Sequence, residues 1–592
     1  MPWKQESLYG AWRHAASIDR NPEVSGLPGF RSLVRALPES ESDAIQQALS
    51  LLGVGEREAE DFLHRQLMSI FGWSAWAAFQ DRQAPGNRFT RQLLAIRLAY
   101  DAALLPIADG YDAQRRITAP SAFTTAAYVA QLAAEGTFRV ALASQLAAGA
   151  GEKPRAARKR LQAVFCIDVR SESYRRALES QADGIETIGF AGFFGMALEY
   201  QNSARCPVLI SPRYKVGVGT TQDGKGWLSG AWAKLRSSAP ACFSQVETGG
   251  LWFGVEIARR LLGWQAGTEE RPRLQWEIPL ESRVRLVGDA LRNMSIRAAD
   301  LAPVVLICGH GSRSENNPYA SSLDCGACGG HQGDVNARFA AALMNDPEVR
   351  QELSRQGVAI PADTVFVAGL HVTTTNEVLL YDTELLTPRQ YGELQGWLRG
   401  ASGTFDSGGA ERSKDWSEVR PEWGLAGNAA FIAAPRSRTR LLDLGGRVFL
   451  HDYDSAADTD GSVLALILTA PVVVASWINL QYYGSTVNNN LFGSGNKVLH
   501  NMVGTFGVWE GNAGDLRTGL PMQSLHDGST WRHEPLRLQV FVEAPRESID
   551  AVLKAHSEVS RLVENDWIHL VAMEGEAFYD RKAAGQWRRL KR

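Results

Sequence analysis

The first part of the chain carries apolar side chains three and four positions apart, the spacing that places them on one face of an α-helix. The pattern is clearest in four stretches, residues 37–53, 59–79, 89–105 and 124–149. The first stretch begins with serines and acidic residues and closes with a glycine, which are typical helix ends. The pattern therefore predicts a helical N-terminal region over residues 1–150.

Further along the chain the apolar residues form short continuous runs that end in polar or glycine-rich turns. Three such runs cover residues 161–169, 302–312 and 363–375, and helical patterns such as residues 335–345 lie between them. Continuous apolar strands that alternate with helices favour a mostly parallel sheet covered on both faces. An α/β core is therefore expected over residues 151–400, with ligand sites beyond the carboxyl ends of its strands.

The C-terminal part of the chain shows an apolar run at residues 536–544, a helical pattern at 546–565 and a second apolar run at 567–573. This order predicts two parallel strands joined by a helix, so residues 401–592 are expected to form an α/β region that packs on the core. Residues 398–416 are rich in glycine, serine and charged side chains and predict a loop. The sequence shows no internal repeat.

One uncharged segment raises the question of membrane insertion. Its apolar centre, residues 463–477, is 15 residues long and contains a proline, whereas a helix that spans a bilayer needs about 20 apolar residues. The residues that follow are rich in amides, which are costly to bury in lipid. The pattern favours a buried helix or strand pair, and a membrane-inserted or partner-facing element is the alternative. The uncharged residues 461–496 are the first candidate surface for a partner.

Composition narrows the class of protein. The chain has 592 residues, of which 45% are hydrophobic and 21% charged, as is typical of a globular protein of several domains. A formal net charge of -3 gives no electrostatic reason to expect nucleic acid as a partner. Six cysteines are too few for a disulfide scaffold, which favours buried thiols or a metal site in a reducing compartment.

Five cysteine and histidine residues end the predicted core strands or follow them closely. Cys166 ends the first apolar run, Cys308 and His310 end the second, and Cys325 and Cys328 come soon afterwards. Thiolate and imidazole are ligands that zinc prefers. Two thiolates and one imidazole balance the charge of a zinc ion and leave a fourth position open, as in catalytic sites.

Asp168 and Arg170 follow Cys166 at alternate positions. In an extended chain, residues two apart point to the same side, so the Asp168 carboxylate can reach a metal bound at Cys166. Arg170 can instead hold that carboxylate in a bidentate pair. The motif therefore predicts two states: a closed site with Asp168 on the metal, and an open site in which a bound water loses a proton near neutral pH.

Two other interpretations of these residues remain open. A lone cysteine at the end of a strand is often a small buried apolar residue without a chemical role. Cys308, His310, Cys325 and Cys328 lie in one segment, and together they can form a structural zinc site that excludes Cys166.

The motif Cys166-Ile-Asp168-Val-Arg170 resembles the Cys-x-Asp-x-Arg motif of β-class carbonic anhydrases. More closely, the chain resembles the DabA family, the large soluble subunit of energy-coupled inorganic-carbon pumps. The resemblance covers most of the chain and includes long, unusual strings, among them CIDVRSE, ETIGFAGFFG, CGHGSRSENNPYASSLDCGACGG and APVVVASWINLQYYGSTVNNNLFGSGNKVLHN.

The resemblance implies a zinc ion held by Cys166, Asp168, His310 and Cys325, with Arg170 as the partner of Asp168. Asp168 and Arg170 are then the catalytic residues, since they open and close the site. The resemblance also implies that the parallel sheet of the core is similar to that of β-class carbonic anhydrases.

The function that the resemblance implies is that of a subunit of an inorganic-carbon transporter. Zinc-dependent, vectorial hydration of CO2 to bicarbonate is driven by a cation gradient through a membrane-embedded, antiporter-like partner of the DabB type. The chain is then expected to lie peripherally on the cytoplasmic side of the inner membrane and to hydrate CO2 only within the complex. Two alternatives stay open: a stand-alone soluble zinc hydrolase or anhydrase, and a non-catalytic subunit with a structural zinc.

Overall fold

The computed structural model describes residues 7–84, 86–107, 121–149, 158–201, 203–207, 209–218, 250, 254–255, 258–259, 273–315, 317, 319–404, 409–415, 417–420, 423–503, 507–511, 514–582 and 585–591. Contacts between residues divide the chain into two compact units. Unit 1 comprises Met1–Tyr128, Ala233–Thr248 and Leu499–Thr518, and unit 2 comprises Val129–Trp232, Gly249–Val498 and Gly519–Arg592. The three-region division expected from the sequence stays a prediction.

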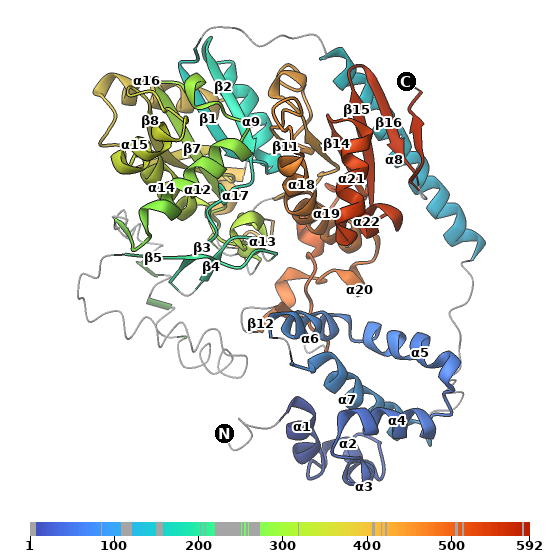
Figure 1. Cartoon of the computed structure of the whole chain (residues 1–592). Helices are drawn as coiled ribbons and strands as arrows, with labels where there is room; N and C mark the ends of the chain where they lie inside the picture. Colours follow the sequence, from blue (N-terminus) through green and yellow to red (C-terminus); the bar gives the residue numbers. More distant parts are fainter. Residues whose placement is uncertain are drawn as a thin grey trace. The chain divides into compact units, whose positions relative to one another are not determined.

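Helices form most of the described part of unit 1, as the apolar spacing predicts (Figure 1). Ser40 begins one of them, because its side chain accepts a hydrogen bond from the backbone N–H of Asp43. The predicted stretch 59–79 is two helices rather than one, since the chain leaves helical geometry at Ile70. The elements are α1 (Leu8–Ala16), α2 (Asn21–Val24), α3 (Phe30–Ala36), α4 (Glu41–Leu51), α5 (Glu56–Met68), α6 (Phe71–Gln83), α7 (Phe89–Leu104) and an antiparallel hairpin of β12 (His500–Val503) and β13 (Gly507–Glu510).

The first sheet of unit 2 contains the three apolar runs predicted as core strands. Its strand order is β2-β1-β7-β8-β9, with parallel pairing as far as β8 and an antiparallel β9. The strands are β1 (Leu161–Cys166), β2 (Ile185–Phe190), β7 (Val304–Gly311), β8 (Val365–Val372) and β9 (Glu377–Tyr381). β1 and β7 are buried along their whole length, which explains why they read as continuous apolar runs.

Helices cover both faces of this sheet. On one face, Val164, Ile307 and Phe366 pack against α12 (Leu280–Asn293), α14 (Asp334–Asn345) and α15 (Pro347–Arg355). On the other face, Phe165 and Leu306 pack against α9 (Val169–Glu179) and α16 (Pro388–Ser402). Successive strand residues thus point to opposite faces, as the pleat requires.

The second sheet of unit 2 confirms the parallel strand pair predicted near the C-terminus. Its order is β11-β10-β14-β15-β16-β17, parallel from β11 to β15 and antiparallel afterwards. Leu142 and Leu146 of α8 (Ala122–Ala148) belong to the core that covers one of its faces. The other elements are β10 (Ala430–Ala433), β11 (Val448–His451), β14 (Leu538–Val542), α21 (Arg546–Ala555), α22 (Ser557–Glu564), β15 (Ile568–Glu574), β16 (Ala577–Arg581) and β17 (Trp587–Arg589).

The two sheets share one strand order. In both, the second strand in the chain lies at the edge, the first lies beside it, the third and fourth continue in parallel, and an antiparallel fifth strand follows as a hairpin. The sequence shows no internal repeat, so the likeness of the two sheets is seen in their strand order. Topology depends on where apolar runs lie and how they connect, and side-chain identity can diverge around it.

The predicted loop over residues 398–416 is wrong in part. α16 extends to Ser402 and α17 (Gly409–Lys414) follows, while residues 405–408 and 416 lie outside the described residues. Leu398 and Ala401 are buried, so one apolar face stabilises the end of α16 despite the glycines. The remaining elements are α13 (Ala320–Leu323) and a small sheet of β3 (Leu198–Tyr200), β4 (Ser203–Arg205), β5 (Tyr214–Val218) and β6 (Leu274–Trp276).

The uncharged segment forms helices, which is one of the two buried forms that its pattern favours. α18 (Ser462–Thr469) and α19 (Pro471–Val487) follow each other directly, and the short α20 (Asn489–Phe492) comes after them. By length and composition, the stretch Ser462–Val487 passes the criteria for a membrane span, with a mean hydropathy of 2.2, but 61% of its most apolar window is buried within the protein. A core helix shows the same combination of features.

Candidate metal centre

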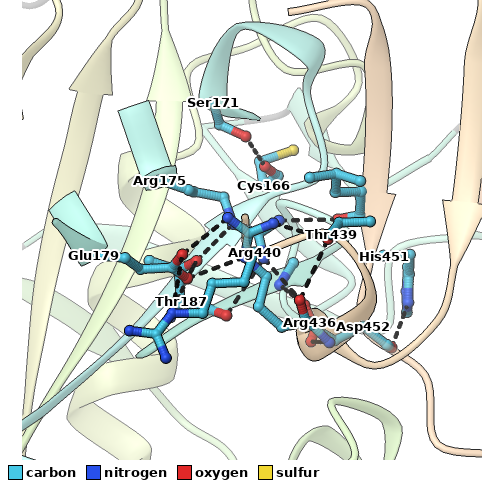
Figure 2. Close-up of polar contacts among 12 residues, drawn as sticks. Cys166, Ser171, Arg175, Glu179, Thr187, Arg436, Thr439, Arg440, His451 and Asp452 are labelled. Atoms are coloured by element: carbon cyan, nitrogen blue, oxygen red, sulfur yellow. Dashed lines mark hydrogen bonds and ion pairs between the residues drawn. The ribbon is translucent and has the colours of Figure 1, made fainter. Parts of the chain in front are cut away.

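The CIDVRSE motif forms the end of a strand and the start of a helix. β1 ends at Cys166, and Asp168 occupies the N-cap of α9, where its carboxylate accepts a hydrogen bond from the backbone N–H of Arg170. The Ser171 hydroxyl lies 2.8 Å from the Cys166 carbonyl oxygen (Figure 2). It also lies 2.7 Å from the carbonyl oxygen of Asp168. These contacts hold the turn that carries the Cys166 and Asp168 side chains at the carboxyl end of β1.

The neighbouring strand β7 brings His310 to the same end of the sheet. Phe165 is paired with Cys308, so His310 lies just beyond the end of β1. Gly309 is required for this approach, since a Cβ there would lie 2.3 Å from the Gly333 carbonyl oxygen. The backbone N–H of Gly333 also donates a hydrogen bond to the His310 carbonyl at 2.9 Å. The turn before α14 therefore fixes the backbone around His310.

Cys325 lies in a tight turn that closes on itself. Its N–H donates to the His331 carbonyl at 3.1 Å, and its carbonyl accepts from the N–H groups of Cys328 and Gly330 at 2.9 and 3.0 Å. Gly329 and Gly330 have φ angles of 68° and 77°, in the left-handed region that favours glycine. Gly329 and Gly330 thus allow the turn that presents the Cys325 sulfur.

Cys166, His310 and Cys325 form a buried group that can hold a metal ion, and we call it the metal group. Their ligand atoms all lie within 4.8 Å of one another. The two sulfurs are 3.8 Å apart, which is about the separation of two thiolates bound at about 2.3 Å to one tetrahedral ion such as zinc. Neither ring nitrogen of His310 has a hydrogen-bond partner among the described residues. An orphaned imidazole beside two thiols fits a metal ion.

The Asp168 carboxylate lies between the metal group and Arg170. Its Oδ1 accepts from Arg170 Nε at 2.8 Å and its Oδ2 from Arg170 Nη2 at 3.0 Å. Oδ2 is also 3.3 Å from His310 Nε2, a contact within ion-pair distance that lacks hydrogen-bond geometry. Burial alone would raise the pKa of Asp168, but the charges of Arg170 and His310 and the hydrogen bonds from Arg170 hold this pKa well below its usual range. The carboxylate is therefore ionised within reach of the metal group.

The two thiols need a cation before they can both ionise. The hydrogen bond with Cys325, together with burial, raises the pKa of Cys166, and burial raises the pKa of Cys325. A bound metal favours the thiolate form and releases the protons.

Gly192 lies against both sulfurs and is a residue that sequence reasoning missed. A Cβ at this position would lie 2.7 Å from the Cys325 sulfur and 2.8 Å from the Cys166 sulfur. The Cys328 thiol donates to the Gly192 carbonyl at 3.2 Å and so holds this segment in place. The only sequence signal is a glycine soon after an apolar strand, which is common, so the contact becomes visible only in three dimensions.

A cavity of about 30 Å³ opens beside the metal group, which is room for one or two water-sized molecules. Cys166, Asp168 and His310 supply its polar wall. The rest of the lining is apolar or glycine: Ile167, Ala191, Phe193, Pro207, Gly326, Ala327, Phe449, Ala470, Pro471, Val474, Ala475 and Ile478. Such a lining suits a small apolar molecule next to the metal group.

The structure does not assemble the alternative site of Cys308, His310, Cys325 and Cys328. Cys308 belongs to the core on the α9 and α16 side of the sheet, while Cys325 belongs to a different core cluster. Cys328 is buried near Cys325 but binds the carbonyl of Gly192. Among the described residues, the group that can hold a metal consists of Cys166, His310 and Cys325, and it includes neither Cys308 nor Cys328.

A buried ion-pair network lies near Cys166 and joins α9 to the segments that follow β10 and β11 (Figure 2). Arg175 of α9 is fully buried and lies 3.1 Å from Asp452, which follows β11. Glu179 at the end of α9 is 2.9 Å from Arg436, which follows β10. The network therefore fastens α9, the helix that Asp168 caps, to the second sheet.

Comparison with known proteins identifies relatives of the whole chain. The family model described as "Probable inorganic carbon transporter subunit DabA" matches residues 1–568. The chain is 43% identical over 657 residues to "Probable inorganic carbon transporter subunit DabA 1" of Bradyrhizobium sp. (strain ORS 278), covering 97% of this chain and 78% of that protein. It is 41% identical over 666 residues to "Probable inorganic carbon transporter subunit DabA" of Chloroflexus aurantiacus (strain ATCC 29366 / DSM 635 / J-10-fl), covering 99% and 79%. No solved structure matches the chain. The chain belongs to the DabA family.

Proposed function

We propose that the chain is a subunit of an energy-coupled inorganic-carbon transporter that hydrates CO2 to bicarbonate at a zinc ion. Cys166, His310 and Cys325 would hold the zinc, and Asp168 would be its fourth, exchangeable ligand. The observation that carries the proposal is the buried metal group beside the Asp168–Arg170 pair and the apolar cavity. The relatives are described as probable inorganic carbon transporter subunits, which supports inorganic carbon as the substrate class.

Zinc in a site of this kind acts as a Lewis acid and lowers the pKa of a bound water to about 7. The residues of the chain control access to that chemistry. With its carboxylate on Arg170, as in this structure, Asp168 leaves the fourth position of the metal group to water. A carboxylate that turns toward the metal group would close it. Thr373 and the Leu323 carbonyl also bind the Arg170 guanidinium, at 3.0 and 2.6 Å, and keep it in place to receive Asp168.

The apolar cavity supports CO2 as the molecule that meets the metal group. CO2 has no net charge or dipole, so it loses little hydration on entering an apolar space. Its carbon would lie next to the position that Asp168 vacates.

Vectorial hydration requires an energy source outside this chain. A catalyst speeds both directions equally and cannot accumulate bicarbonate by itself. We therefore propose a membrane-embedded, antiporter-like, cation-translocating partner of the DabB type, with this chain peripheral on the cytoplasmic side of the inner membrane. Asp168 is the two-state element on which the partner would act. The exposed Trp477 on the uncharged α19 supports the 461–496 segment as the contact surface.

Inorganic-carbon uptake in cells tests the proposal. Uptake is expected only when this chain and a membrane partner are made together, and Cys166→Ala or Asp168→Asn should abolish it while the chain still accumulates. The purified chain alone should show little CO2 hydration. Anhydrase-like turnover by the purified chain would favour the stand-alone enzyme instead, and unchanged uptake in Cys166→Ala would overturn the zinc mechanism.

A further inference from the structure

Part of the cavity wall comes from α19 and from Ala470, the residue that joins α18 to α19. Ala470, Pro471, Val474, Ala475 and Ile478 line this part. Together they present methyl, methylene and ring carbon atoms and no charged group. The cavity is therefore polar at the metal group and apolar on the wall formed by Ala470 and α19.

Only three of the residues that line the cavity are partly exposed, and they adjoin one another. They are Gly326, Val474 and Ile478, while all other lining residues are buried. A Cβ on Gly326 would lie 3.4 Å from both the Val474 and the Ile478 side chain, in ordinary van der Waals contact. These three residues are the part of the cavity lining that reaches solvent, where α19 lies beside Gly326, and we call them the portal.

We propose that the portal determines specificity, admitting small uncharged molecules to the metal group and excluding anions. The proposal deepens the proposed function and rests on it, since it makes CO2 rather than bicarbonate the species that enters. Val474 and Ile478 are then specificity-determining residues outside the ligand set. Selection at the portal changes which species reaches the metal group and leaves the reaction equilibrium unchanged.

Charge and size both support this selection. An anion that passes between two aliphatic side chains loses hydration without gaining a partner, which carries a large free-energy cost. With a volume of about 30 Å³, the cavity cannot hold an anion together with its hydration shell.

Two linear triatomic molecules of the same shape separate charge from size. Nitrous oxide is uncharged and cyanate is an anion, and both are isoelectronic with CO2. Infrared spectroscopy of the purified full-length chain can follow each one, because its stretching band shifts when it leaves water. The wild type should give a saturable shifted band with nitrous oxide and none with cyanate. Equal binding of both would overturn the proposal.

Variants at the portal test which residues carry the selection. Val474→Phe should block the opening, and Gly326→Ala should narrow it by one methyl group without touching the ligand side chains. Each should weaken nitrous oxide binding, Val474→Phe by about tenfold or more, the factor that corresponds to about 1.4 kcal/mol. The matched controls are Val129→Phe on an exposed face of α8 and Gly396→Ala, whose new Cβ would meet nothing within 4 Å in α16.

These measurements distinguish failure of the portal proposal from failure of the proposed CO2 hydration. Nitrous oxide binding equal in Val474→Phe and Val129→Phe would overturn the portal, even if Cys166→Ala abolishes uptake. Should Val474→Phe fail to fold, by circular dichroism, the comparison of Gly326→Ala with Gly396→Ala decides the point. Unchanged uptake in Cys166→Ala, with portal-dependent nitrous oxide binding, would sink the proposed function and retain the selective portal.

Discussion

The two sheets of unit 2 have the same strand order and different strand ends. β1 ends at Cys166 and β7 carries His310, whereas β10 is followed by Ala434 and Pro435 and β14 ends at Val542. Among the described residues, the group that can hold a metal includes side chains from the strand ends of the first sheet and none from the second, although β11 ends at His451. The comparison teaches that this fold offers a position for a site, and that a few residues at strand ends decide whether chemistry occurs there.

The second sheet still contributes to the site, as support and cover. The N–H of Leu450 in β11 donates to the Ile167 carbonyl at 3.3 Å, and the N–H of Asp452 to the Gly189 carbonyl at 2.8 Å. Phe449 of the same strand lines the cavity, and α19 forms part of its wall. The first sheet thus supplies Cys166 and His310, and the second sheet supplies the apolar Phe449 to the cavity wall.

Removing a metal ligand from the first sheet should have the largest effect, because the first sheet would then lack a complete metal site, like the second. Cys166→Ala is expected to lower the zinc content of the purified chain from about one ion to nearly none, because the site loses one of its two thiolates. Metal analysis of the folded protein measures this. Cys308→Ala is the control and should keep its zinc, since that thiol lies in a different core cluster. Zinc lost from Cys308→Ala and kept in Cys166→Ala would favour the structural site.

Breaking the ion-pair network between α9 and the second sheet should lower the free energy of unfolding. Arg175→Ala leaves the Asp452 carboxylate buried without its guanidinium partner and is expected to lower the free energy of unfolding by about 3–5 kcal/mol. Denaturant unfolding of the purified chain provides the measurement. Arg355→Ala breaks an exposed pair with the partly exposed Glu352 and should cost about 1 kcal/mol or less. Similar costs for both variants would show that the network does not join the sheets.

Acid should lower the stability of unit 2 through buried histidines, among them His371 in β8, His451 in β11 and His533. Burial lowers the pKa of each of these three histidines to about 4, below the usual value of about 6.5. The unfolded chain binds more protons between these values, so stability falls as the pH drops from about 6.5 to about 4, by about 3 kcal/mol for each histidine.

Unfolding free energies measured across this pH range check the expectation. His533 Nδ1 accepts a hydrogen bond from the Gly427 N–H, which protonation would remove. Replacing His451 and His533 by asparagine should reduce the pH dependence relative to the wild type. An unchanged slope in the double variant would assign the acid sensitivity to other groups.

A methyl group at Gly192 should disturb only the metal-binding sheet. Gly192→Ala would push its Cβ against both sulfurs and is expected to weaken zinc affinity by about 10–100-fold, as changes behind metal ligands often do. Competition with a chelator measures the affinity. Gly396→Ala, at an open helix position, should bind zinc as the wild type does. Equal affinity in the two variants would mean that Gly192 does not position the sulfurs.

The sequence predicts the elements of unit 2 well because their patterns are local. Residues 161–169, 302–312 and 363–375 contain β1, β7 and β8, and the helical stretch 335–345 lies within α14. The grouping of Cys166 with His310 and Cys325 was expected from thiols at strand ends and from the family resemblance. Asp168 differs slightly from the expectation, since it caps α9 after the strand has ended.

Other features depend on packing between distant segments and leave no local pattern. Gly192 matters because the chain after β2 passes beside two sulfurs, and nothing in its sequence neighbours shows that. Val474 and Ile478 read as ordinary helix residues until α19 is seen to rest on Gly326. The shared strand order of the two sheets also leaves no local sequence pattern, because it depends on which distant strands pair with each other.

X-ray absorption at the zinc edge of the purified chain tests the central claim most directly, because it counts the ligand types around the metal. The account predicts two sulfur ligands at about 2.3 Å together with nitrogen or oxygen ligands at about 2.0–2.2 Å. In Cys166→Ala the two-sulfur signal should disappear. A site with three sulfurs, or a wild-type spectrum that persists in Cys166→Ala, would contradict it.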